Sequence, residues 1–94
     1  MRVVGKDKLL AFKKEQPQSR APLNAWLIEA EEAKWAQWAD IKKRYPKADW
    51  LGKNRVVFDI KGNSFRLVAL VYFRMGSVII ERVGTHAEYD KWHL

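Results

Sequence analysis

The feature that most constrains the fold is a run of strand-forming segments between residues 54 and 83. Three stretches are rich in β-branched and aromatic residues, which favour extended backbone. They are Arg55–Ile60, Phe65–Phe73 and Val78–Val83. The dipeptide Gly62-Asn63 separates the first two and is typical of a two-residue hairpin turn. This part of the chain therefore predicts a three-stranded antiparallel meander.

A turn at Gly62-Asn63 also determines which residues face each other across the first hairpin. On one face every predicted pair is apolar: Ile60 with Phe65, Phe58 with Leu67 and Val56 with Ala69. The other face pairs Asp59 with Arg66, Val57 with Val68 and Arg55 with Leu70. We expect the apolar face to lie on the core, because burying it removes the most apolar surface from water.

The turn around Arg74-Met75-Gly76 decides the position of Arg82. A two-residue loop at Met75-Gly76 would place Arg82 on the core face, opposite Ala69. A three-residue loop would place it beside Val68, on the same face as Arg66 and Tyr72. One residue of slip separates the two registers. We favour the second, because burying an unpaired arginine is costly.

Helical patterns occupy most of the first half of the chain. Val3 and Val4 fit a short first strand, and a helix is expected from about Asp7 to Gln16. Apolar residues then recur at helical spacing in two sets that are out of phase: Leu23, Trp26, Leu27 and Ala30, then Trp35, Trp38, Ile41 and Tyr45. We expect a break near residues 33–34, an end of the helical region at Pro46, and a loop over 47–53. Helices on one side of an antiparallel sheet make a single α+β domain over residues 1–94.

Composition and charge narrow the class of partner. The formal net charge is +7, a balance that favours acidic partners such as nucleic acid. No apolar run approaches the roughly 20 residues needed to span a membrane, and the N-terminus lacks the pattern of a signal peptide, so we expect a cytoplasmic protein. The chain has no cysteine, and its only histidines are His86 and His93. We therefore expect neither a metal site nor a cofactor; phosphate-binding glycine loops and the common hydrolase motifs are also missing.

Cations around one histidine are the residues that could act on RNA. The strands and their turns carry Arg55, Lys61, Arg66, Arg74 and Arg82, and His86 and Tyr89 follow the last strand. Cleavage by the 2′-hydroxyl needs a base, cations on the phosphate, and an acid for the leaving oxygen. Arginine contacts two phosphate oxygens at once, and histidine can be acid or base near neutrality. Each residue also has a structural explanation: Arg66 can pair with Asp59, and Tyr89 can cap the core.

The chain resembles the HigB family of type II toxin–antitoxin toxins. The resemblance is most distinctive over residues 54–63, 65–67 and 83–91, and the central segment with Trp35, Asp40, Tyr45-Pro46 and Ala48-Asp49 is similar as well. The family implies a RelE-like fold, with a short N-terminal strand and two to three helices on an antiparallel sheet. It implies an endoribonuclease that cuts mRNA on the ribosome without a metal. It also implies a HigA-type antitoxin with a helix-turn-helix domain as the partner, so that any DNA contact is indirect.

Carried over by position, the resemblance implies catalytic roles for Arg66, Arg82, His86 and Tyr89. It implies RNA contacts for Lys61, Arg74 and Lys91, to which the strand cation Arg55 is added. Which residue is the acid and which is the base stays open.

Two other functions fit the same residues less well. A non-catalytic protein could occupy RNA or the ribosome through phosphate attraction alone, and its binding would weaken steeply with salt. A DNA-binding regulator is disfavoured, because the tryptophan-bearing helices carry Glu29, Glu31 and Glu32 and no segment resembles a basic recognition helix.

Overall fold

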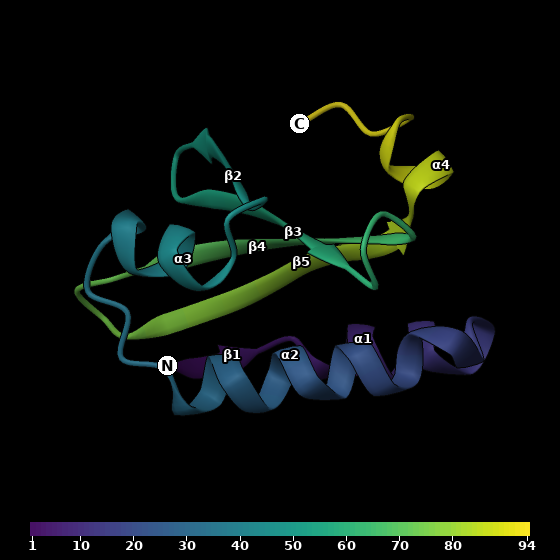
Figure 1. The fold of residues 1–94 in the computed structure, drawn as a ribbon, viewed down its shortest axis with the longest axis horizontal. Coiled ribbons are helices and arrows are strands. Elements are labelled where there is room, and N and C mark those ends of the chain that lie inside the picture. Colours follow the sequence, from purple (N-terminus) through teal and green to yellow (C-terminus); the bar gives the residue numbers. More distant parts are fainter.

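The chain folds into a five-stranded mixed sheet with its long helices on one face (Figure 1). A computed structural model describes residues 1–94. The elements are β1 (Arg2–Val4), α1 (Lys6–Glu15), a 3₁₀ turn (Pro17–Ser19), α2 (Arg20–Glu32), α3 (Trp38–Arg44), β2 (Asp49–Gly52), β3 (Arg55–Ile60), β4 (Phe65–Tyr72), β5 (Ser77–Thr85) and α4 (His86–Tyr89). The strand order is β1-β5-β4-β3-β2, with β1 parallel to β5 and the other neighbours antiparallel. The expected α+β class and the short first strand, β1, are confirmed, and β2 is a further edge strand that was not expected.

The core lies between the sheet and helices α1, α2 and α3. Phe58 is fully buried at its centre, where Trp26 packs against it edge-on and Trp35 stacks on it, with ring centroids 5.3 and 6.2 Å away. The opposite face of the sheet, called the open face below, carries Arg55, Arg66 and Arg82. In Figure 1, α4 and the C-terminus lie on the open-face side, away from α1 and α2. The fold therefore separates an apolar face from a cationic one.

The predicted register of the first hairpin is confirmed at all six pairs, from Arg55 with Leu70 to Ile60 with Phe65. The turn is closed by a hydrogen bond that the Ser64 amide donates to the Lys61 carbonyl (3.1 Å), around Gly62-Asn63. Turn chemistry and apolar alternation thus agree, and together they bring Asp59 opposite Arg66 on the open face.

The second turn differs from both expectations. Tyr72 pairs with Ser77, and the Gly76 amide donates to the Phe73 carbonyl (3.2 Å), so the turn centres on Arg74-Met75, one residue before the two-residue loop considered at Met75-Gly76. The pairing then slips: Ile80 faces Ala69, but Arg82 faces Val68, which leaves Glu81 as an extra residue in β5, a β-bulge. Arg82 therefore does lie beside Val68 on the open face, as expected, but it reaches this position through the bulge.

The break between α2 and α3 lies where expected. Helix α2 ends at Glu32, and Ala33 adopts extended backbone. The amino group of Met1 donates to the Ala33 carbonyl (2.5 Å), a contact that is favourable because a positive group lies at the C-terminal end of a helix.

Two local expectations from the sequence are wrong. Trp35 is not helical, because α3 begins only at Trp38, where Gln37 and Asp40 form a capping box. The expected loop over 47–53 contains strand β2, whose Trp50 pairs with Val56. The residues after the last strand, for which no element was predicted, begin with helix α4. No helix combines the length and the apolar character that crossing a bilayer requires.

Tyr45, just after α3, joins this region to the core. Its ring packs edge-on against Phe58 at 5.3 Å, and its hydroxyl donates to a carboxylate oxygen of Glu29. Burial, reinforced by the hydrogen bond to Glu29, raises the pKa of the Tyr45 phenol. The expected end of the helical region is confirmed, since α3 stops two residues before Pro46.

Candidate active site

Helix α4 lies over one end of the sheet and forms one side of the site. Thr85 and Glu88 make a capping box: the Glu88 amide donates to the Thr85 hydroxyl (3.1 Å), and the Thr85 amide donates to the Glu88 carboxylate (2.8 Å). The amide of His86 donates to the carbonyl of Ser64 (3.1 Å), which ties α4 to the turn between β3 and β4. The residues after the last strand are thus held against the sheet.

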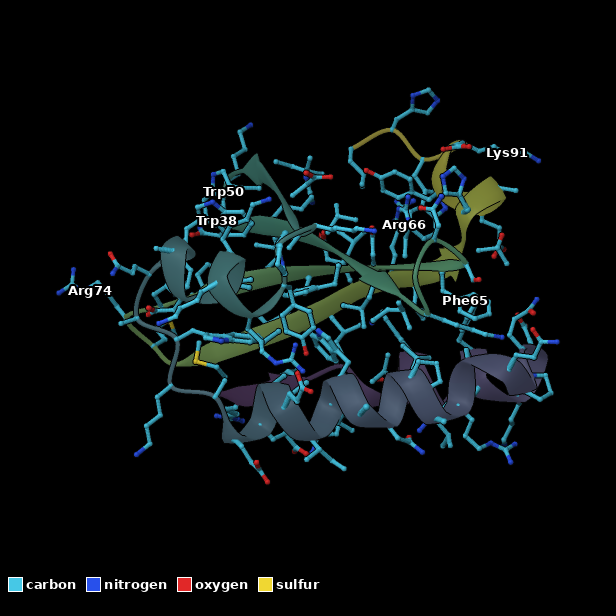
Figure 2. All side chains as sticks on the ribbon, in the orientation of Figure 1. Trp38, Trp50, Phe65, Arg66, Arg74 and Lys91 are labelled. Carbon is cyan, nitrogen blue, oxygen red and sulfur yellow. The ribbon has the colours of Figure 1, made fainter.

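Arg66 lies beneath α4 and is the most enclosed cation of the open face (Figure 2). Its side chain is 13% exposed, and Nη1 lies 3.0 Å from Oδ1 of Asp59. Nη2 donates to Oδ1 of Asn63 (2.8 Å), and the guanidinium lies over the ring of Tyr89, 5.6 Å from its centroid. The contact with Asp59 is an ion pair without hydrogen-bond alignment, so the buried Nη1 has no hydrogen-bond acceptor. The guanidinium of Arg66 is therefore held in one position, and its Nη1 group has hydrogen-bond donors that are not used.

Arg82 lies on the same face, one strand away. Its guanidinium lies over the ring of Trp92, 5.4 Å from the centroid, and no carboxylate pairs with it. Trp92 contacts Tyr89 edge-on, with ring centroids 5.9 Å apart. Arg66, Tyr89, Trp92 and Arg82 thus form a continuous series of contacts, in which two arginines are held by two aromatic rings.

His86 stands at the start of α4, where Asp90 approaches it one helical turn later. Nδ1 of His86 lies 3.3 Å from Oδ2 of Asp90, and the two side chains are 43% and 60% exposed. A carboxylate at Nδ1 orients an imidazole and leaves Nε2 to exchange a proton. His86 is therefore accessible and oriented, as a general acid or base has to be.

Arg55 also lies on the open face, but its guanidinium is paired with Glu81. Its Nε donates to Oε1 of Glu81 (2.7 Å) and its Nη2 to Oε2 (3.1 Å), a bidentate pair. The hydrogen bond from Arg55 holds the pKa of the Glu81 carboxyl below its usual range, and the same contact raises the pKa of Arg55. The residue left over by the bulge in β5 thus neutralises one of the expected RNA contacts.

The remaining expected RNA contacts are scattered. Lys61 lies at the α4 end of the sheet, but its ammonium donates to Gln18 in the 3₁₀ turn of the helix layer (3.2 Å). Arg74 lies in the β4–β5 loop at the opposite end of the molecule from Lys91, which projects outward near α4 (Figure 2). The structure therefore brings Arg66, Arg82, His86 and Tyr89 to the α4 end, with Lys91 nearby, and separates Arg74 from them.

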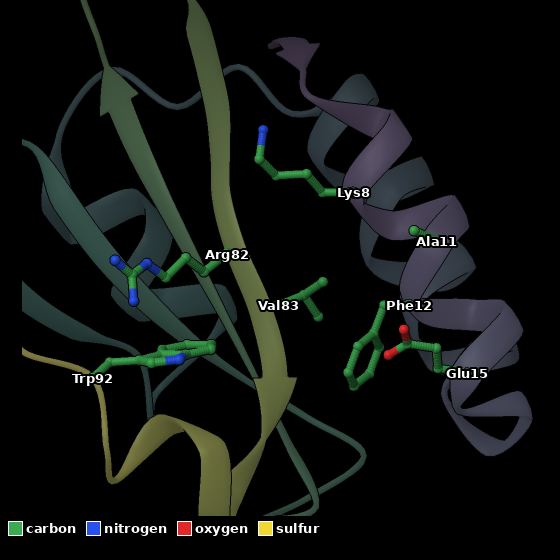
Figure 3. A pocket seen from close by; sticks show the side chains of 7 residues that line it. All are labelled: Lys8, Ala11, Phe12, Glu15, Arg82, Val83 and Trp92. Carbon is green, nitrogen blue, oxygen red and sulfur yellow. The ribbon is translucent and has the colours of Figure 1, made fainter.

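An open groove of about 310 Å³ borders the site (Figure 3). Strand β1 pairs only with residues 77–79 of β5, so the last part of β5 has a free edge. Arg82 and Trp92 lie on one side of this edge and Phe12 of α1 on the other. No three His, Asp or Glu side chains gather closely enough to hold a metal ion.

The sequence interpretation did not include several residues that complete the site. Asp90 is one of them, although His86 and Asp90 are spaced i, i+4, the spacing at which helical side chains meet. The capping pair Thr85 and Glu88 could have signalled the helix that makes this spacing meaningful. Trp92 had no local signal, because its role depends on contacts with β5.

A comparison with known families identifies the chain. The sequence model of the HigB toxins, described as the RelE-like toxic component of a toxin–antitoxin system, matches residues 19–92. The chain belongs to the HigB toxin family.

Curated relatives match a shorter part. The mRNA interferase toxin HigB of Escherichia coli strain K12 and the mRNA interferase HigB of Shigella flexneri are each 40% identical over 53 residues, covering 53% of this chain and 50% of the relative. The chain spans about half the length of the curated relatives it matches.

Proposed function

We propose that this HigB-family toxin is an endoribonuclease that cuts mRNA on the ribosome, without a metal, by using the RNA's own 2′-hydroxyl. The observation that carries the proposal is the gathering of Arg66, Arg82, Tyr89 and His86 at the α4 end of the open face. The names of the relatives agree with this activity, since both are called mRNA interferases.

The proposed reaction is a transfer within the RNA. The 2′-oxygen attacks the adjacent phosphorus and loses its proton to a base, while the bond from phosphorus to the 5′-oxygen breaks and that oxygen takes a proton from an acid. The products are a 2′,3′-cyclic phosphate and a 5′-hydroxyl. Arg66 and Arg82 would neutralise the charge that builds on the phosphate oxygens. His86, oriented by Asp90, would carry one of the two protons, and Tyr89 would carry the other or stack on a base.

The partners follow from the same proposal. The RNA would be mRNA in the ribosome, with Lys91 contributing further phosphate attraction. A HigA-type antitoxin with a helix-turn-helix domain would neutralise the toxin and make any contact with DNA, and both would act in the cytoplasm. Co-expression with a small helix-turn-helix protein encoded beside this gene should then relieve toxicity.

The experiment is brief induction of the toxin without an antitoxin, followed by mapping of mRNA 5′ ends and measurement of growth. We expect growth arrest and new 5′ ends at codon-linked positions. Arg66→Ala and His86→Ala should abolish both effects at equal protein level. Arg20→Ala and His93→Ala, which change the same residue types away from the site, should remain toxic.

A non-catalytic binder gives a different result. Translation would stall while mRNA stayed intact, and Arg66→Ala would weaken the stall in proportion to lost binding. Intact mRNA in arrested cells would therefore reject the endonuclease, and full toxicity of both site variants would reject the site.

A further inference from the structure

We propose that Trp92 is a positioning residue, which holds Arg82 and Tyr89 in the arrangement that the reaction needs. The inference rests on the proposed function and extends its site to the C-terminal segment. The geometry behind it is the contact series from Arg66 through Tyr89 and Trp92 to Arg82.

Arg82 depends on Trp92 for its position. No hydrogen bond from its guanidinium and no ion pair to a carboxylate holds it, and the side chain is exposed. A long arginine side chain without partners samples many rotamers, so the face of the Trp92 ring is the contact that selects one of them. Figure 3 shows the two side chains next to each other on one side of β5.

The position of the Trp92 ring is in turn set by Gly84. A Cβ atom at residue 84 would lie 2.7 and 2.8 Å from two carbons of the Trp92 ring, closer than carbon atoms approach one another. The absence of a Cβ at residue 84 is therefore needed for the ring to approach β5 this closely. Gly84 also pairs with Arg66 across the sheet, so the ring lies against the strand position next to Arg66.

Tyr89 is held from both sides. The guanidinium of Arg66 lies over its ring at 5.6 Å, and Trp92 contacts it edge-on at 5.9 Å. Helix α4 is only four residues long, so its backbone alone gives little rigidity. Removing the indole would free Tyr89 and Arg82 together.

Trp92 could instead be a simple apolar cover, and kinetics separate the two roles. Loss of a cover lowers the amount of folded protein and leaves the kcat of the folded fraction unchanged. Loss of a positioning residue lowers kcat, because a misplacement of about 1 Å can cost on the order of 100-fold. Phenylalanine keeps a flat ring, so Trp92→Phe should retain most of the wild-type kcat.

The first test measures cleavage of ribosome-bound mRNA. Trp92→Ala should lower kcat roughly 10- to 100-fold with little change in KM, whereas Trp92→Phe and the tail control His93→Ala should stay within about threefold of the wild type. Gly84→Ala should resemble Trp92→Ala, and the double variant should be no worse than Trp92→Ala alone, because Gly84 acts through the ring. Additive losses or an unchanged kcat in Trp92→Ala would overturn the inference.

The second test needs no cleavage and so separates this inference from the proposed function. In NMR spectra of the free protein, the ring of Trp92 should shift the Nε–H resonance of Arg82 from its usual position. Trp92→Ala and Gly84→Ala should remove the shift and Trp92→Phe should keep part of it. If the wild type cleaves no RNA, the proposed function fails while this arm still decides whether Trp92 positions Arg82. An Arg82 signal that Trp92→Ala leaves unchanged would reject the positioning role.

Discussion

Arg66 shows, at the scale of single residues, how the fold prepares a cation for phosphate. Its side chain is far less exposed than that of Arg82, and its charge is balanced by Asp59 across the hairpin. A phosphate that approaches Arg66 has to compete with this carboxylate. The pair therefore holds the arginine in place, and in the proposed function it would weaken the binding of RNA.

Removing the charge of Asp59 should expose this competition. Asp59→Asn should tighten binding of a short RNA that lacks the attacking 2′-hydroxyl by at most about fivefold, the factor that corresponds to ~1 kcal/mol for such a pair. It should also lower the free energy of unfolding by about 1–3 kcal/mol, because Arg66 loses a partner in an enclosed position. Fluorescence anisotropy and urea unfolding measure the two effects. Asp49→Asn changes the net charge equally; if it tightens binding as much, Asp59 does not compete.

The pair of Arg55 and Glu81 makes a prediction about pH. Glu81 has a folded-state pKa below its unfolded value, so its stabilising effect is present above the unfolded pKa and is lost as pH falls through the folded one. Arg55→Ala should thus be less stable than the wild type at neutral pH, and the difference should vanish in acid once Glu81 is protonated in both states. Urea unfolding across this range tests it, with Arg20→Ala as control. A difference that is independent of pH would contradict the assignment.

At the scale of elements, the bulge lets β5 direct its apolar side chains toward the helices and still place Arg82 on the open face. Val78, Ile80 and Val83 all face the helices, although the spacing changes from two residues to three. The extra residue, Glu81, absorbs this change and leaves Arg82 on the open face. With this turn and without the bulge, Glu81 rather than Arg82 would pair with Val68.

Because Glu81 is the extra residue, its deletion should be tolerated. Pairing would become regular, and Arg82 would still face Val68. We expect deletion of Glu81 to match Glu81→Ala in urea unfolding within roughly 1 kcal/mol, since both lose only the contact with Arg55. Deletion of Ile79 should cost several times more, because it moves neighbouring side chains to the wrong face. If the two deletions were equally harmful, the bulge would have a structural role beyond absorbing one residue.

The strands of the sheet show what the sequence could and could not predict. The first hairpin follows from two local signals that agree, a Gly-Asn turn and strict apolar alternation, so all six pairs were predicted correctly. The bulge has a local signal in the spacing of Val78, Ile80 and Val83, but neither of the two predicted registers contains a bulge. Strand β2 was missed because its Trp50 and Leu51 are exposed and give no buried pattern.

The candidate site divides in the same way. Arg66 follows from the register of the first hairpin, and the face of Arg82 follows from the cost of burying an unpaired arginine. His86 and Tyr89 follow from their place after the strand and from the family resemblance. The contacts that join these residues involve Trp92, whose ring lies against Gly84. These two residues are close only in the folded chain. No periodicity or turn rule could have brought this tryptophan to the site.

For the whole molecule, one end of the sheet unites the elements that the proposed activity needs. In the proposed function, the net charge of +7 would attract RNA to the surface. Helix α4 and the C-terminal segment bring a histidine and a tyrosine close to two arginines of the sheet. Charge alone would make a binder, whereas this arrangement can also move two protons.

The most direct test of the account is cleavage of a defined mRNA on purified, programmed ribosomes. The wild type should produce a 2′,3′-cyclic phosphate and a 5′-hydroxyl at one site. A single 2′-deoxy nucleotide at that site should block cleavage there, and Arg66→Ala and His86→Ala should each lower the rate by about 100-fold or more. Cleavage that survives the 2′-deoxy substitution, or that leaves a 5′-phosphate, would contradict the account.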